Sequence, residues 1–163
     1  MSTPQQLVEE TLNRLQIPYT LVEHPAVYTM EEIQRLSFPG REKAVKNLFL
    51  RDDKKRSYYL VVLPGQKTAD LKRLQEQIPS RKLSFASEAD LAARLGLLKG
   101  SVTPLGILND REHTVQVVLD RQLLEETEIG IHPNRNDATL LLAPGDLVRV
   151  IRDQGNPLVL VDL

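Results

Sequence analysis

Two polar residues, Lys46 and Asn47, interrupt the apolar stretch KAVKNLFLRD at positions 43–52. The stretch is typical of a buried β-strand, in which successive side chains point to opposite faces. Lys46 therefore shares a face with Leu48, and Asn47 shares the other face with Phe49. Burying an amide without a partner costs about 2–7 kcal/mol. The pair therefore lies at the strand's edge, with the lysine head in water, or lines a pocket.

A glycine-rich loop, GSVTPLG at positions 100–106, is a second candidate for chemistry. Glycine lets a ligand approach the main chain, and consecutive backbone N–H groups can bind a carboxyl-like group or an oxyanion. The alternative is an ordinary connection between a helix and a strand. The residues that could bind a ligand here are Gly100, Ser101, Val102, Thr103 and Pro104.

Two more segments combine a histidine with neighbours that can form a pocket. In GIHPNRNDAT, Gly130 precedes His132 in a loop rich in Asn and Asp, although the same residue types also build ordinary turns. In EHPAVYTM, Tyr28 and Met30 could form a pocket wall, or simply pack beside the end of a strand.

Several kinds of chemistry are excluded or disfavoured by the residues present. The chain has no cysteine, which rules out disulfides, thiolate zinc sites and a cysteine nucleophile. Its three histidines are dispersed and form no HExxH motif, so we expect no metal and no cofactor. It also has no GxSxG elbow, P-loop or dinucleotide-binding fingerprint. Any hydrolysis would proceed without a recognisable protein nucleophile.

Composition and charge limit the partners. The 163 residues are 41% hydrophobic and 26% charged, which is typical of a globular protein with one full core. A formal net charge of −1 argues against a general nucleic-acid binder, and we expect no DNA partner. No apolar run reaches the roughly 18–20 residues of a membrane helix, and the start does not resemble a secretory signal. We expect a cytoplasmic protein without a membrane partner.

The elements that position these residues follow from hydrophobic periodicity and capping signals. The pattern predicts helices after Thr3, over residues 30–37, after Thr68, from Ser87 and from Pro144. It predicts strands at YTLVEH, KAVKNLFLRD, YYLVVLP, TVQVVLD, TLLLA and PLVLVDL. The short charged link between the second and third of these indicates an antiparallel pair. We therefore expect one α+β domain over residues 1–163, with a mixed, largely antiparallel sheet and helices packed against it.

The motifs KAVKNLFLRD, YYLVVLPG, GSVTPLGI and IHPNRNDATLLL, in this order, resemble the YbaK/ProX family of prolyl-tRNA editing domains. These are free-standing relatives of the insertion domain of prolyl-tRNA synthetase, and the resemblance runs from about residue 5 to the end of the chain. It implies that Lys46 and Asn47 are the catalytic pair. It further implies that residues 100–104, Gly130 and His132 bind the substrate, with a pocket wall drawn from Val27, Tyr28, Met30, Ile33 and Leu48.

The resemblance also implies a reaction. The N-terminal segment is most similar to the branch that deacylates alanyl-tRNA(Pro), so the expected substrate is an alanyl ester on the acceptor end of tRNA(Pro). Lys46 would stabilise negative charge on the carbonyl or, alternatively, act as a base. Cysteinyl-tRNA(Pro), another small aminoacyl-tRNA, or simple binding without catalysis are the other possibilities.

The resemblance implies partners as well. These are the tRNA acceptor end and, as a second partner, prolyl-tRNA synthetase. Six cations around the KAVKNLFLRD strand could contact acceptor-stem phosphates, or could simply form a solvated turn; they are Arg41, Lys43, Arg51, Lys54, Lys55 and Arg56.

Overall fold

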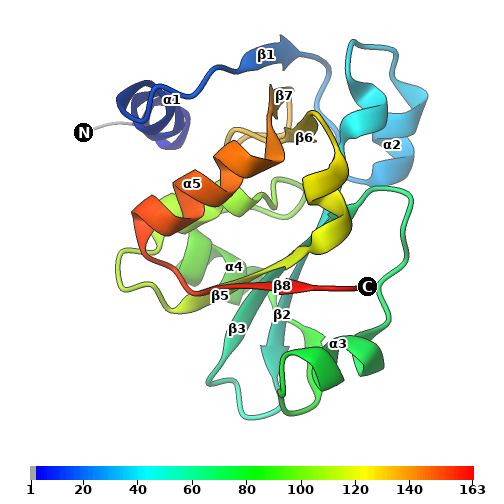
Figure 1. Cartoon of the computed structure of the whole chain (residues 1–163), viewed down its shortest axis with the longest axis vertical. Helices are drawn as coiled ribbons and strands as arrows, with labels where there is room; N and C mark the ends of the chain where they lie inside the picture. Colours follow the sequence, from blue (N-terminus) through cyan, green and yellow to red (C-terminus); the bar gives the residue numbers. More distant parts are fainter. Residues whose placement is uncertain (1–2) are drawn as a thin grey trace.

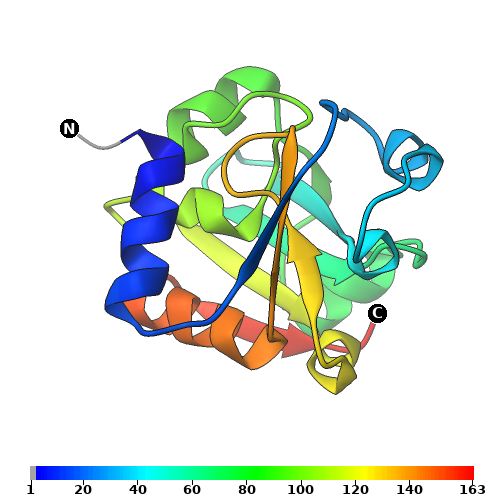
Figure 2. The same ribbon diagram turned by 90° about the horizontal axis from the view of Figure 1, so that it is seen from above.

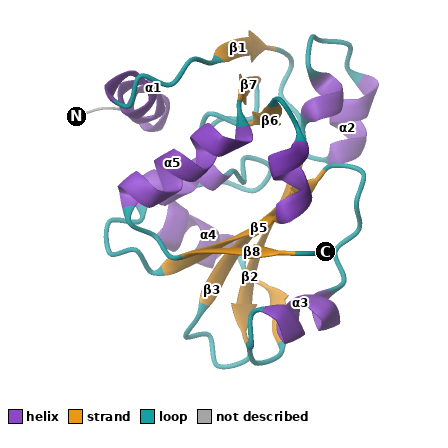
Figure 3. Cartoon of the chain, in the orientation of Figure 1, coloured by secondary structure: helices purple, strands orange, loops and turns teal. Residues whose placement is uncertain are grey.

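A computed structural model describes residues 3–163, apart from the side chain of Gln34. Figures 1 and 3 show helices arranged around two sheets. The helices are α1 (Pro4–Arg14), α2 (Met30–Arg35), α3 (Leu71–Gln77), α4 (Glu88–Leu95) and α5 (Pro144–Gln154), with short 3-10 helices at Arg41–Lys43, Pro104–Asn109 and Arg121–Glu125. The strands are β1 (Thr20–Glu23), β2 (Val45–Asp52), β3 (Tyr58–Pro64), β4 (Leu83–Phe85), β5 (Val115–Asp120), β6 (Ile129–Ile131), β7 (Ala138–Leu142) and β8 (Leu158–Val161).

The predicted helix starts are confirmed where a capping residue was present. Thr3 and Gln6 form a capping box around Pro4 at the start of α1. Ser87 caps α4, which ends at Gly96 in the left-handed conformation that glycine tolerates best. The helix expected after Thr68 begins later, because Asp70 is the N-cap of α3 and its side chain accepts the backbone N–H groups of Lys72 and Arg73.

The larger sheet has five strands in the order β4-β2-β3-β5-β8. β2 pairs with β3 and with β4 in antiparallel register, which confirms the predicted hairpin. β3 pairs with β5, and β5 with β8, in parallel register. Both faces of this sheet are covered, and Figure 1 shows α5 above it and α3 below. A sheet covered on both faces explains why β3 reads as a continuous apolar run.

The smaller sheet has the order β1-β7-β6 and is antiparallel throughout. Figure 2, seen from above, shows these strands crossing over the rest of the fold. We expected one mixed sheet and named six strands, whereas the eight strands of the described chain form two sheets. The two additional strands, β4 and β6, have three residues each, too few to show an alternating pattern.

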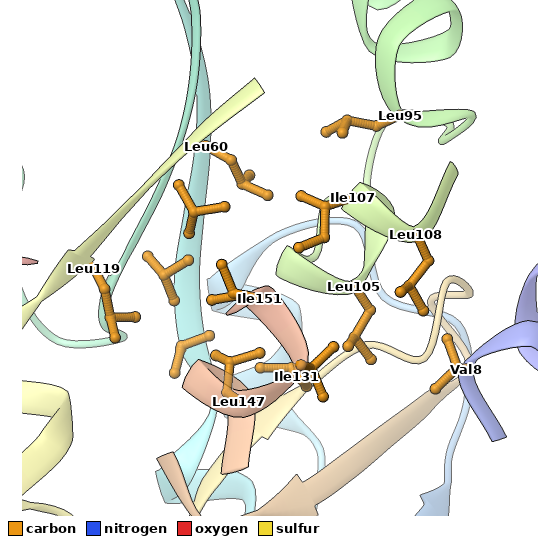
Figure 4. Packing of buried hydrophobic residues seen from close by; sticks show 14 of the residues in the cluster. Val8, Leu60, Leu95, Leu105, Ile107, Leu108, Leu119, Ile131, Leu147 and Ile151 are labelled. Carbon is orange, nitrogen blue, oxygen red and sulfur yellow. The ribbon is translucent and has the colours of Figure 1, made fainter. Parts of the chain in front are cut away.

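The core is divided by the five-stranded sheet. On one face, Leu60, Val117 and Leu119 pack with side chains from α1, α4, α5 and the 104–109 helix (Figure 4). On the other face, Val61 and Leu63 pack against Leu74 of α3. The alternation of residues along β3 between the two clusters is the period-two pattern of a strand. No helix among residues 3–163 is long and apolar enough to cross a membrane.

Candidate active site

A pocket of about 180 Å³ lies at the start of β2, where the two sheets approach each other. Gly130 of β6 forms an isolated bridge with Ala44, while β4 covers the far end of the same strand from Leu50 onward. The pocket opens along the stretch of β2 between these two neighbours. Its lining residues are Val27, Tyr28, Thr29, Met30, Ile33, Val45, Lys46, Asn47, Gly100, Val102 and His132.

Four segments that the sequence singled out separately therefore meet in one cavity. Residues 27–33, the Lys46-Asn47 pair, the start of the glycine-rich loop and His132 all contribute to its wall. Of the wall candidates, Leu48 does not line this pocket and faces a neighbouring groove. Lys46 and Asn47 interrupt the apolar strand because both side chains line the cavity.

The ammonium group of Lys46 is held by the main chain. Its Nζ donates a hydrogen bond of 2.6 Å to the carbonyl oxygen of Lys67. Lys67 is itself fixed, because its Nζ lies 2.7 Å from Oδ2 of Asp120, which is only 1% exposed. An ammonium group has three N–H donors, so two remain for a ligand after the bond to the carbonyl.

Gly65 allows the turn after β3 to reach this position. A Cβ atom on Gly65 would lie 2.5 Å from the carbonyl oxygen of Ala44 and 2.7 Å from Cε of Met30. The backbone oxygen of Ala44 leaves no room for a Cβ, whereas the end of the Met30 side chain could move aside. Because Gly65 has no side chain, the turn can pack against Ala44 and Met30. This position places the Lys67 carbonyl beside Lys46.

Asn47 carries an unsatisfied polar atom. Its Oδ1 is buried and has no hydrogen-bond partner among the described residues. Such atoms are rare, because leaving a buried acceptor unpaired costs about 1–3 kcal/mol. The atom lies in a side chain that lines the pocket, so a ligand hydroxyl or N–H group is the natural donor.

In the glycine-rich loop, Gly100 and Val102 line the pocket, whereas Thr103 and Pro104 are buried behind its wall. Gly100 has φ +88°, and a Cβ there would lie 2.7 Å from Cδ1 of Tyr28. Gly100 thus lets the loop pack directly on Tyr28, whose side chain is 62% exposed at the pocket mouth. Val102 lines the cavity, whereas Ser101 is partly buried beside it.

Thr103, Pro104 and Gly130 lie behind the pocket wall. Thr103 is fully buried, and its hydroxyl donates to the carbonyl oxygen of His132 at 2.6 Å. Pro104 is buried at the first position of the 3-10 helix. A Cβ on Gly130 would lie 2.9 Å from Cγ2 of Thr139 in β7 and 3.4 Å from Cα of Ala44, so glycine lets β6 pack closely against both. These three residues connect the loop and β6 to the wall without lining the main cavity.

His132 is held in one tautomer. Its Nδ1 lies 3.1 Å from the carbonyl oxygen of Ala138, which can only accept, so Nδ1 carries the proton. Burial lowers the pKa of His132 from its ordinary value; the hydrogen bond to Ala138 opposes this shift, and nearby His24 adds to it. The imidazole is therefore neutral near pH 7, and Nε2 is left as an acceptor.

The arrangement provides a fixed cation, an unpaired amide oxygen and a neutral imidazole around a small cavity. Such a set can bind a carbonyl oxygen that gains negative charge, together with an adjacent hydroxyl group. Within residues 3–163, no group of three His, Asp or Glu side chains is arranged to hold a metal ion.

The six predicted phosphate-binding cations do not gather around this pocket. Lys43 pairs with Glu128 at 2.8 Å, Arg51 pairs with Asp90 at 2.8 Å, and Arg41 donates to the carbonyl oxygen of Leu36. The others, in the β2–β3 turn, lie six strand residues or more beyond Lys46, which is about 20 Å at 3.3 Å per residue.

Sequence reasoning missed Thr29, Val45, Lys67 and Asp120. Thr29 caps α2, and Val45 precedes the Lys46-Asn47 pair. Lys67 acts through its backbone carbonyl, which leaves no signal in the residue type. Asp120, an acid at the end of an apolar strand, is a signal in the sequence that could have indicated a buried partner for a cation.

Comparison with known proteins gives a consistent result. Residues 24–150 match the family described as the aminoacyl-tRNA editing domain. The chain is 45% identical to the "Prolyl-tRNA editing protein ProX" of Acetoanaerobium sticklandii, over 97% of this chain and 96% of that protein. It is 38% identical to the "Prolyl-tRNA synthetase associated domain-containing protein 1" of Danio rerio, over 94% of this chain and 84% of that protein.

Solved structures show the same fold. A crystal structure described as a candidate trans-editing enzyme for prolyl tRNA synthetase superposes with a TM-score of 0.72 at 21% identity. The superposition covers 100% of this chain and 99% of the other chain. At this identity the match shows that the two chains share a fold.

Proposed function

Because this chain belongs to the aminoacyl-tRNA editing domain family, we propose that it is a trans-acting deacylase that removes alanine from mischarged alanyl-tRNA(Pro). The reaction is hydrolysis of the ester between the amino acid and the terminal ribose. Water adds to the ester carbonyl carbon, the C–O bond to the ribose breaks, and the leaving oxygen takes up a proton. The products are free alanine and tRNA with both ribose hydroxyls restored.

The observation that carries the proposal is the fixed ammonium group of Lys46 at the pocket wall. When water adds, the carbonyl oxygen becomes negatively charged, and a preorganised donor stabilises that charge. The bond to the Lys67 carbonyl at 2.6 Å holds the ammonium group in place and leaves two N–H groups for this oxygen. We assign Lys46 this electrostatic role in preference to that of a base, because Lys46 is the only lysine or arginine among the described lining residues and no second cation there favours the neutral amine.

Asn47 is assigned to the substrate's ribose. An ester on one ribose hydroxyl leaves the neighbouring hydroxyl free, and that O–H can donate to the unpaired Oδ1 of Asn47. The bond would satisfy the only side-chain oxygen of Asn47 and fix the ester beside Lys46. The same ribose hydroxyl is then oriented to bind and align the attacking water.

The size of the cavity supports a small aminoacyl group as the substrate. At about 180 Å³ it is smaller than the roughly 300–1,000 Å³ of ordinary ligand sites, so it suits a small aminoacyl group. A synthetase site for proline rejects a smaller amino acid weakly, since each missing methylene is worth about 1–3 kcal/mol. A second pocket that admits alanine and excludes proline corrects that error.

The test is a panel of alanyl-, cysteinyl-, seryl- and prolyl-tRNA(Pro) incubated with the purified protein. We expect release of alanine that is at least tenfold faster than release of any other amino acid, with prolyl-tRNA(Pro) left intact. Preferred release of cysteine would reassign the substrate within the same reaction. Binding of these tRNAs without release of any amino acid would show a non-catalytic binding module and defeat the proposal.

A further inference from the structure

A second groove, of about 410 Å³, adjoins the pocket and shares Asn47 and Val102 with it. It lies between β2 and the start of α4. Its wall is mostly apolar and includes Leu48, Phe49, Phe85, Ala86, Leu91 and Val102. The Phe85 side chain is 62% exposed, an unusual position for an aromatic residue on a strand.

The groove forms because α4 begins early. Ala86 N–H donates to the carbonyl oxygen of Phe49 at 3.0 Å, which continues the ladder between β4 and β2 by one residue. The next pairing would place Glu88 opposite Asn47, but Ser87 caps α4 and the chain turns away. The edge of β2 is therefore uncovered at Asn47.

The uncovered edge exposes a backbone donor and acceptor. In a regular strand the N–H and C=O groups of residues two apart point to the same side. Phe49 points its carbonyl toward β4, so Asn47 points its N–H and C=O groups into the groove, away from β3. Neither group has a hydrogen-bond partner among the described residues outside the β2–β3 ladder.

The charge of the groove favours a neutral ligand. Lys99 and Glu88 are its only charged lining residues, and they lie 3.9 Å apart at the rim with side chains 81% and 75% exposed. The one cation among the described lining residues, Lys99, therefore has a carboxylate of opposite charge beside it. A flat, apolar wall beside one donor and one acceptor suits a nucleobase, since aromatic side chains stack on bases and backbone groups bind their edges.

We propose that this groove binds the terminal adenine base of the substrate RNA, stacked on Phe85 and hydrogen-bonded to the backbone of Asn47. Adenine presents an N6 donor next to an N7 acceptor, which matches the C=O and N–H groups of Asn47, whereas guanine presents two acceptors there. Asn47 thus contacts the ribose with its side chain and the base with its backbone. The inference rests on the proposed deacylase function and names the nucleoside subsite of the same substrate.

The first test uses alanyl-RNA stem-loops that end in adenosine, in guanosine or in an abasic ribose. With the adenosine end, we expect Phe85→Ala to raise KM on the order of tenfold, the loss of one base stack, with kcat changed by less than about twofold. Phe85→Tyr should restore KM. Leu124→Ala, at an exposed leucine outside both cavities, is the matched control and should leave KM unchanged.

The terminal base decides whether the effect of Phe85 comes from stacking. With the abasic end, the wild type should show the raised KM and Phe85→Ala should add nothing further. The guanosine end should give a KM between the other two. An unchanged KM in Phe85→Ala, or a full effect of the substitution on the abasic end, overturns the proposal and leaves the groove to another partner, such as a peptide on the β2 edge.

A binding measurement separates this inference from the proposed function. The probe is 3′-alanylamino-3′-deoxyadenosine, whose amide bond resists hydrolysis, titrated by calorimetry. If the wild type releases no alanine from any RNA but binds the probe about tenfold more tightly than Phe85→Ala does, the deacylase function fails and the base subsite stands. If alanine is released and the two proteins bind the probe equally, the subsite fails and the function stands.

Discussion

The two ends of strand β2 carry similar polar residues but satisfy them differently. At the turn end, Oδ1 of Asp52 accepts N–H groups from Arg56 at 2.9 Å and Ser57 at 3.3 Å. Asp53 pairs there with Arg81. At the pocket end, Oδ1 of Asn47 is buried without a partner among the described residues, and Lys46 is bound only by a backbone carbonyl.

The difference shows which observation separates a site from a solvated turn. Charge and polarity are greater at the turn end, where the residues RDDKKR are concentrated. Polar groups that are paired within the chain contribute to stability, whereas a buried group left unpaired costs free energy. The unpaired end is therefore the one at which a ligand gains most by binding.

The largest expected effect is at the pocket end, on catalysis. Lys46→Ala should lower kcat for alanine release about 10²–10³-fold, the usual effect of removing one donor to an oxyanion. The melting temperature should change little, because the Lys67 carbonyl can bind water instead. Steady-state kinetics and thermal denaturation measure the two effects. Retention of more than a tenth of the wild-type kcat would remove Lys46 from the mechanism.

Asn47→Ala should lower kcat/KM about 10–100-fold, since it removes one hydrogen bond to the substrate worth about 1–3 kcal/mol. The free energy of unfolding should change by less than about 1 kcal/mol, because the deleted oxygen has no partner within the described chain. Urea denaturation measures the stability. A large destabilisation with unchanged kcat/KM would show that Asn47, like Asp52, serves stability and not substrate binding.

Asp52→Ala should give the opposite result, with stability lost and activity kept. Two backbone N–H groups lose their acceptor, and the melting temperature should fall by roughly 2–4 °C.

The N–H of Arg56 is the main cause of the lowered pKa of Asp52, with burial opposing it. This stability is present above the ordinary pKa of an aspartate and is lost as the pH falls through the lowered value. Calorimetry of both proteins at several pH values should show their difference shrinking in acid, and a constant difference would contradict the assignment.

A further contrast concerns pH and the pocket wall. The pKa of His132 is lowered mainly by burial. At pH values between this lowered pKa and the ordinary histidine pKa of about 6.5, the imidazole is protonated in the unfolded chain but not in the folded chain. Stability should therefore decrease as the pH falls through that window. His132→Gln should flatten this slope between pH 7 and 5.5 in urea denaturation, and an unchanged slope would assign it to other groups.

The smallest effect is expected from Lys54→Ala and Lys55→Ala at the turn. These residues lie about 20 Å from Lys46 along β2, beyond the roughly 8–10 Å over which charges act at physiological salt. KM for alanyl-tRNA(Pro) should change by less than about twofold. A salt-dependent increase in KM of fivefold or more would show that the turn contacts the tRNA.

The sequence predicts most of the fold through local signals. The capping box at Thr3, the Ser87 cap and the charged β2–β3 link each specify a boundary by themselves, and the structure confirms all three. The division into two sheets is not predictable in this way. It depends on β4 and β6, which are short and held by pairing with distant strands.

The sequence predicts the parts of the candidate site that are formed by side chains. It does not predict the parts that are formed by backbone groups. Lys46, Asn47 and His132 were visible because a polar residue in an apolar strand or a histidine in a loop stands out. The carbonyl of Lys67 and the uncovered edge at Asn47 have no residue type of their own. Only the register of β2 and the path of the following turns reveal them.

The carbonyl that binds Lys46 has an evolutionary consequence. Every amino acid provides a carbonyl, so a change of residue type at position 67 keeps the group that faces the ammonium. The length of the turn after β3 has no such tolerance, since one inserted residue would move that oxygen out of reach. In homologous chains this turn should therefore vary in residue identity and resist insertions and deletions.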